Sequence, residues 1–129
     1  MKTEDIEQQL LGKDVFDITL VDGEPAPLPG DVIDGYLKER GIKRAELIRR
    51  VNLDRNYGYQ ILNGRRMPTK EQIVLIALYL RLSVEQAQYL LKISGREQLY
   101  VRNIQDAKAM YALEHKMDLY DYFDLLENE

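Results

Sequence analysis

Hydrophobic residues recur at spacings of three and four along most of the chain after residue 30. This spacing places apolar side chains on one face of a helix, while Ser, Thr, Asp or Asn in front and Gly behind are typical of helix ends. The pattern predicts a bundle of about five helices and then two more. They begin at or are capped by Asp31, Lys43, Asp54, Thr69, Ser83, Asn103 and Asp118.

The first thirty residues follow a different pattern. Thr3–Leu11 predicts a short helix, and apolar and polar residues alternate over Val15–Val21 as in an extended segment. Three prolines at 25, 27 and 29 exclude a helix where they stand. We therefore expect an all-α protein with an arm and linker over 1–30, a domain over 31–93 and a helical extension over 94–129.

Two of the expected helices, 43–51 and 54–62, are short and separated by a tight connection, which is the layout of a helix-turn-helix. The second helix of such a unit enters the major groove with its first residues, so these must be polar and able to bond base edges. Arginine bonds guanine, and asparagine and glutamine bond adenine. The candidate base-reading residues are Arg55, Asn56, Tyr57 and Gln60.

Other residues of this region are suited to phosphate. Lys43 and Arg44 stand at the start of the first short helix, where unbonded N–H groups and the helix dipole favour an anion. Asn63, Arg65 and Arg66 follow the second short helix and are placed to hold the DNA backbone.

Charge first seems to oppose this prediction. The 129 residues hold 18 basic and 22 acidic side chains, a formal net charge of −4. Resolved along the chain, the net charge is −7 over 1–37, +7 over 38–70 and −4 over 71–129. The basic window coincides with the two short helices, which is the electrostatic pattern of a nucleic-acid site, although solvated helix faces are the commoner cause of a charge run.

Residues 41–68, GIKRAELIRRVNLDRNYGYQILNGRRMP, resemble the Cro/C1-type (XRE-like) helix-turn-helix family. The likeness extends over about 31–92, through Leu47-Ile48, the turn Asn52-Leu53, the run Asn63–Pro68 and the step Leu82-Ser83-Val84. It implies a bacterial or phage regulator that binds operator DNA as a dimer. It also implies base reading by Arg55, Asn56 and Gln60 and phosphate binding by Arg44, Asn63 and Arg65.

Three residues depart from that family's pattern. Arg44 stands where the family usually has Gln, and arginine still bonds phosphate. Gly58 stands where the family buries an aliphatic residue, so we expect a hole in the recognition helix that Tyr57 or Tyr59 fills. Leu62 stands where Glu is frequent, and it adds apolar surface to the core or to a dimer contact.

The composition limits other chemistry. Without cysteine there is no disulfide or thiolate chemistry, and one histidine does not make a His-rich metal site. We find no catalytic constellation, so we expect no enzyme, no metal, no cofactor and no evident small-molecule ligand. The N-terminus lacks the apolar stretch of a signal peptide and no run is long enough to span a membrane, so we expect a cytoplasmic protein.

The sequence thus predicts a transcriptional regulator that binds double-stranded DNA sequence-specifically, with the extension at 94–129 helping to form a homodimer. The alternative is a protein-interaction or adaptor module that reuses the fold without reading DNA. A further hypothesis is that the acidic arm folds over the basic window and competes with DNA.

Overall fold

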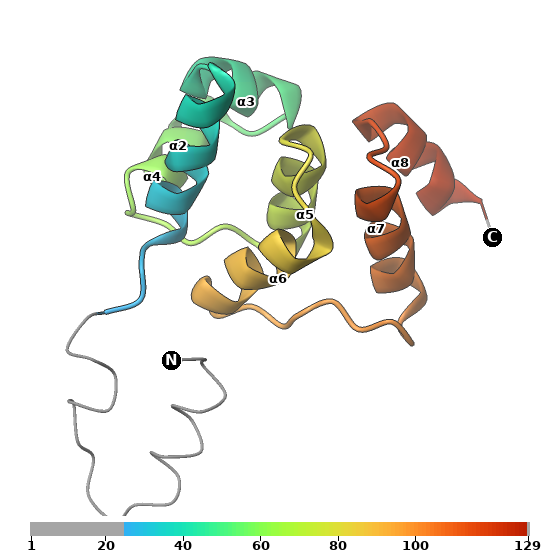
Figure 1. Ribbon diagram of the computed structural model, residues 1–129. Coiled ribbons are helices and arrows are strands. Elements are labelled where there is room, and N and C mark those ends of the chain that lie inside the picture. Colours follow the sequence, from blue (N-terminus) through green and yellow to red (C-terminus); the bar gives the residue numbers. More distant parts are fainter. Residues whose placement is uncertain (1–24, 129) are drawn as a thin grey trace, which may run out of the picture.

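The computed structural model describes residues 25–128, and all regular secondary structure within them is helical (Figure 1). The helix expected at Thr3–Leu11 and the extended segment expected at Val15–Val21 lie outside the described residues. None of the described helices has the length and apolar character needed to cross a membrane. The helices are α2 (Pro29–Arg40), α3 (Arg44–Arg50), α4 (Arg55–Leu62), α5 (Lys70–Tyr79), α6 (Val84–Ile93), α7 (Ile104–Glu114) and α8 (Leu119–Glu127).

Helix α5 lies at the centre and contacts α3, α6, α7 and α8 (Figure 1). The sequence predicted it as an amphipathic helix with one apolar face, but it is buried on several sides, because helices pack around it and few of its residues are left for solvent. Its first turn is secured by a capping box, in which Thr69 and Gln72 bond each other's backbone N–H groups. The buried residues of α5 are Ile73, Val74, Ile76, Ala77 and Leu78.

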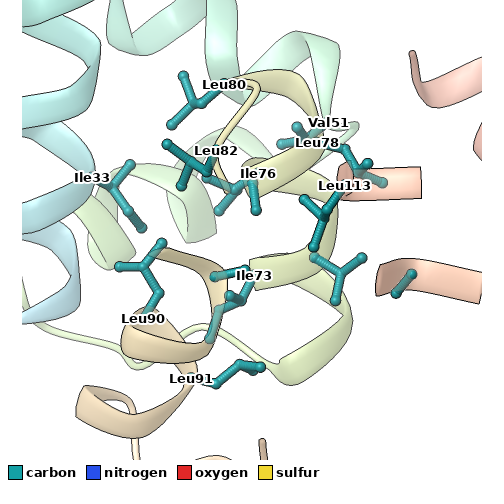
Figure 2. Packing of buried hydrophobic residues seen from close by; sticks show 14 of the residues in the cluster. Ile33, Val51, Ile73, Ile76, Leu78, Leu80, Leu82, Leu90, Leu91 and Leu113 are labelled. Carbon is teal, nitrogen blue, oxygen red and sulfur yellow. The ribbon is translucent and has the colours of Figure 1, made fainter. Parts of the chain in front are cut away.

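One hydrophobic core joins the helices, and Figure 2 shows Ile33 of α2, Ile76 of α5 and Leu90 of α6 around Leu82, with Leu113 of α7 near Leu78. The last two helices belong to this core, since Leu113 of α7 and Tyr122 of α8 are both buried in it. The extension over 94–129 is therefore packed on the rest of the chain through α5 and α6.

Helix α2 begins earlier than the sequence predicted. The expected cap at Asp31 is wrong: the helix starts at Pro29, with Leu28 in the capping position and no side-chain cap. Proline suits the first helical position because no N–H is needed there and its φ is already helical. Residues 29 and 30 thus belong to the helix and not to the expected linker.

Gly30 explains how closely α2 approaches α4. A Cβ atom at this position would lie 2.3 Å from the carbonyl oxygen of Ile61 and 2.8 Å from that of Leu62. Only glycine permits this contact between the start of α2 and the backbone at the end of α4. The first turn of α2 is therefore held against the end of α4.

Three helix-to-helix turns share one local design. One residue has a left-handed φ, the next is apolar, and the third caps the following helix with its side chain. The N–H of the apolar residue donates to the carbonyl five residues earlier, at 2.9 to 3.0 Å, which closes the preceding helix. The three turns are Asn52-Leu53-Asp54, Arg81-Leu82-Ser83 and Lys116-Met117-Asp118.

Two of these turns are bonded to each other. Nη1 of Arg81 donates to the carbonyl of Lys116 at 2.9 Å, and Nζ of Lys116 donates to the carbonyl of Arg81 at 3.1 Å. Nζ of Lys116 also lies 3.3 Å from the carbonyl oxygen of Leu82. We call this reciprocal contact the turn clasp. It fastens the α7–α8 turn to the α5–α6 turn.

Candidate nucleic-acid interface

Helices α3 and α4 form a compact pair with one buried and one exposed side. Asp54 caps α4 by accepting a hydrogen bond from the N–H of Tyr57 at 3.1 Å, as the sequence predicted. The buried side of α4 consists of Gly58, Ile61 and Leu62. Arg55 and Asn56 are exposed at its first turn. The pair therefore presents polar side chains at the start of its second helix.

The hole expected at Gly58 is not there. A Cβ atom at this position would lie 2.6 Å from Cγ1 and 2.9 Å from Cδ1 of Ile48, so the side chain of α3 already fills the space. Glycine thus lets α4 pack closely on α3, and neither Tyr57 nor Tyr59 is needed as a filler. Leu62 is buried in the core of this chain, one of the two roles expected for it.

Arg66 lies along α4 and joins two of the candidate base-reading residues. Its Nε donates to Oε1 of Gln60 at 3.0 Å, and its guanidinium carbon lies 4.6 Å from the centre of the Tyr57 ring. Such a cation–π contact is worth about 0.5–1 kcal/mol at an exposed site. Gln60 and Tyr57 are half-buried, so Arg66 and these two side chains form one surface element.

Arg44, expected as a phosphate ligand, is engaged within the chain. Its Nε and Nη2 donate to the two carboxylate oxygens of Asp34 at 2.9 and 2.7 Å, and its Nη1 donates to Oδ1 of Asn63 at 3.1 Å. Two of the expected phosphate ligands, Arg44 and Asn63, are thereby brought together. The sequence did not predict a role for Asp34, because its pairing with Arg44 joins two helices across ten residues and follows no local pattern.

The Asp34–Arg44 contact changes the titration of both groups. The hydrogen bond from the Arg44 guanidinium holds the pKa of the Asp34 carboxyl below its ordinary value, and the same bond raises the pKa of Arg44. The pair joins α2 to the start of α3, and the bond to Asn63 extends it to the end of α4. Any anion that binds here meets a guanidinium already held in place.

Four basic side chains, which we call the basic surface, flank the exposed side of α4. Lys43 precedes α3, Arg55 begins α4, and Arg65 and Arg66 follow α4; all four are exposed. The ion pairs among residues 25–128 are Arg40–Glu39, Arg44–Asp34 and Lys70–Asp106. None of these pairs among the described residues includes a side chain of the basic surface.

Other sites of chemistry are sparse in the described part of the chain. No group of three His or acidic side chains between residues 25 and 128 is arranged to hold a metal ion. Asp118, which directly precedes α8, caps that helix by accepting a hydrogen bond from the N–H of Asp121 at 2.8 Å. The His115 ring is stacked on Tyr111 at the end of α7, with 4.0 Å between ring centres.

No family model matches this chain, and comparison with curated proteins and with solved structures gives no match either.

Proposed function

We propose that this chain is a transcriptional regulator that binds double-stranded DNA sequence-specifically, with α4 in the major groove and α3–α4 acting as a helix-turn-helix. The observation that carries the proposal is the division of α4 into two sides. Gly58, Ile61 and Leu62 hold the helix in the core, while Arg55 and Asn56 stand exposed at its first turn. The resemblance of residues 41–68 to the Cro/C1-type family supports the same conclusion.

The chemistry of the exposed side matches base edges. In the proposed complex Arg55 donates two hydrogen bonds to a guanine, and Asn56 bonds an adenine through its amide. Gln60 lies one turn further along α4 and reads a neighbouring base. Because its Oε1 already accepts from Arg66, the position of Gln60 in the groove depends on Arg66.

Phosphate contacts fix the register of α4. In the proposed complex Lys43, Arg65 and Arg66 contact phosphates on either side of the groove. Asn63 and Arg44 are hydrogen-bonded to each other at an exposed position, and in the proposed complex both also donate hydrogen bonds to phosphate. These contacts carry no sequence information, so they set affinity for all duplexes alike.

A single unit of this size reads about half of an operator site, and dimers solve this by reading two half-sites one DNA turn apart. We propose that the C-terminal extension forms the dimer contact. Three of its apolar side chains are largely exposed: Tyr120 at 82%, Ile104 at 70% and Val101 at 65%. Light scattering at high micromolar concentration tests this, and a monomeric mass rejects it.

Selection of binding sites from random duplex DNA tests the main proposal. It is expected to yield a recurring, palindromic site. With that site, Arg55→Ala should cost about 1–3 kcal/mol of binding free energy and relax one base position. Arg65→Ala should weaken all sequences alike. Lys92→Ala, in the last turn of α6 and outside both α4 and the proposed dimer contact, should leave binding unchanged.

Salt dependence supplies the second measurement. The logarithm of the binding constant should fall with the logarithm of salt concentration by about 0.9 for each phosphate contacted, and Arg65→Ala should reduce this slope by about 1. If selection returns no recurring site and binding is equal for all sequences, the adaptor alternative replaces the regulator. The exposed aromatic and aliphatic residues of the C-terminal extension are the observation that favours that alternative.

A further inference from the structure

We propose that the acidic N-terminal segment, residues 1–24, binds the basic surface of its own chain and competes there with DNA. This inference rests on the proposed function, because it describes how the same surface is regulated. We call the segment the acidic arm. It contains two lysines and seven acidic residues, which are Glu4, Asp5, Glu7, Asp14, Asp17, Asp22 and Glu24.

Charge complementarity is the first argument. The basic surface consists of Lys43, Arg55, Arg65 and Arg66, and no acidic residue among 25–128 forms an ion pair with any of them. With seven acidic residues against two lysines, the arm is strongly acidic. A polyanion that fits the surface is therefore already covalently attached to it.

The attachment point is the second argument. A Cβ atom at Gly64 would lie 2.9 Å from Cδ1 of Leu28, so the side chain of Leu28 rests directly on Gly64. Gly64 is followed at once by Arg65 and Arg66. The contact of Gly30 with the carbonyl of Ile61 fixes the same end of α2. Leu28, four residues after the last residue of the arm, is therefore anchored next to Arg65 and Arg66 of the basic surface.

The reach of the arm covers the surface. Helix α4 has eight residues, which is about 12 Å at 1.5 Å per residue. The first described residue is Pro25, and Asp17 lies eight residues before it, so Asp17 can extend to roughly 26 Å from that point at about 3.3 Å per residue. The acidic residues from Asp17 toward the N-terminus therefore have enough chain to span the length of α4.

Tethering makes weak ion pairs effective. A segment joined by a short connection meets its site at an effective concentration on the order of millimolar. The apparent Kd for DNA rises in inverse proportion to the fraction of chains whose surface is open, so about nine-tenths occupancy by the arm weakens binding about tenfold. Salt screens these exposed charges over about 8 Å at physiological ionic strength.

The test uses the full chain with its arm neutralised by three substitutions: Asp14→Asn, Asp17→Asn and Asp22→Asn. The matched control changes the net charge equally at three exposed positions outside the arm, the basic surface and the C-terminal extension: Glu39→Gln, Glu71→Gln and Glu85→Gln. On the selected duplex at low salt, the neutralised arm should bind about tenfold more tightly and the control less than about twofold. The gain in affinity should shrink as salt rises, because salt weakens the ion pairs through which the unaltered arm competes with DNA.

Equal gains from the two variants, or no gain from either, overturn the inference. A measurement without DNA separates it from the proposed function. The NMR signals of the Nε–H groups of Arg55 and Arg65 should differ between the unaltered chain and the neutralised arm, and the difference should disappear at about 1 M salt. Identical signals reject the arm contact. Distinct signals with no selected duplex site uphold the contact and reject the DNA-reading function.

Discussion

The pair α3–α4 and the pair α7–α8 share a local design and differ in the surface that they expose. Both consist of two short helices joined by a left-handed residue, an apolar residue and an aspartate cap, at 52–54 and at 116–118. The first pair exposes arginine and amide side chains. The second exposes Tyr120, Phe123 and acidic residues of α8. The same backbone design is thus compatible with two different exposed surfaces.

Both pairs are also tied to the rest of the chain by one ion pair across helices. Asp34 of α2 holds Arg44 of α3, and Lys70 of α5 holds Asp106 of α7 at 3.0 Å. The difference lies in the additional contacts. Glycine lets α4 approach α3 and α2 closely, whereas the turn clasp fastens α7–α8.

The largest expected change in unfolding free energy tests whether the helix pairs α3–α4 and α7–α8 are parts of one core. Leu47 of α3 and Leu113 of α7 are each about 1% exposed. Replacing either by alanine should cost about 2–5 kcal/mol of unfolding free energy, because each leaves a cavity. Denaturant unfolding followed by circular dichroism and tyrosine fluorescence should show one transition in both variants. A separate early transition in Leu113→Ala would mean that α7–α8 is an independent unit.

The next effect concerns the close packing that only α3–α4 has. Gly58→Ala should destabilise the chain by about 1–2 kcal/mol, since overpacking against Ile48 outweighs the gain in helix propensity. Ile48→Ala alone should cost about 2–5 kcal/mol. The double variant should cost clearly less than the two single changes together, because the new methyl group enters the vacated space. If the cost of the double variant equals the sum of the two single costs, the side chains at positions 48 and 58 do not compete for the same space.

A smaller effect concerns the ion pair of the α3–α4 pair. Asp34 has a lowered pKa in the folded chain, so the unfolded chain binds the proton more readily in acid. Its contribution is present above the ordinary value of 3.8 and is lost as pH falls through the folded-state pKa. Asp34→Asn should therefore cost at most about 1 kcal/mol at pH 7, since Arg44 is partly exposed, and nothing in strong acid.

The unfolding free energy of the unaltered protein and of Asp34→Asn, measured as a function of pH, checks this prediction. Glu39→Gln is the control, because the Arg40–Glu39 pair is exposed and 3.4 Å long. It should leave the curve unchanged at every pH. A cost of Asp34→Asn that persists at the acid end would assign the effect to packing rather than to charge.

The smallest effect compares the left-handed residues of the two turns. Asn52→Gly should raise stability by a few tenths of a kcal/mol, because glycine removes a strain that asparagine already tolerates well. Lys116→Gly relieves about 1 kcal/mol of strain but removes the two bonds of its ammonium group, so it should be nearly neutral. Thermal unfolding distinguishes these outcomes, and a clear gain from Lys116→Gly would show that the clasp contributes little.

Local signals explain which parts of the fold the sequence could predict. Asp54, Thr69 and Ser83 cap the helices that they were expected to cap, and Gly41, Gly64 and Gly95 have the positive φ expected after a helix. Capping depends on residues within one turn, so it can be read from a short stretch of chain. The all-helical class was predicted for the same reason, and the described residues confirm it.

Tertiary contacts explain what the sequence did not predict. The role of Pro29 depends on the approach of Gly30 to the end of α4, and the role of Gly58 depends on Ile48 of another helix. The partner of Arg44 lies ten residues away on α2. In the candidate site, the residue types and the exposure of Arg55 and Asn56 were accessible from the pattern. The pairing of Arg66 with Gln60 and Tyr57 was not.

The turn clasp has a consequence for slow hydrogen exchange. The amide protons of Leu82 and Met117 close their respective turns by bonding carbonyls five residues earlier. Opening either turn removes a donor and an acceptor that the other turn uses, so the opening of one turn makes the opening of the other easier. Breaking the clasp should thus speed the hydrogen exchange of both amide protons, although they lie 35 positions apart.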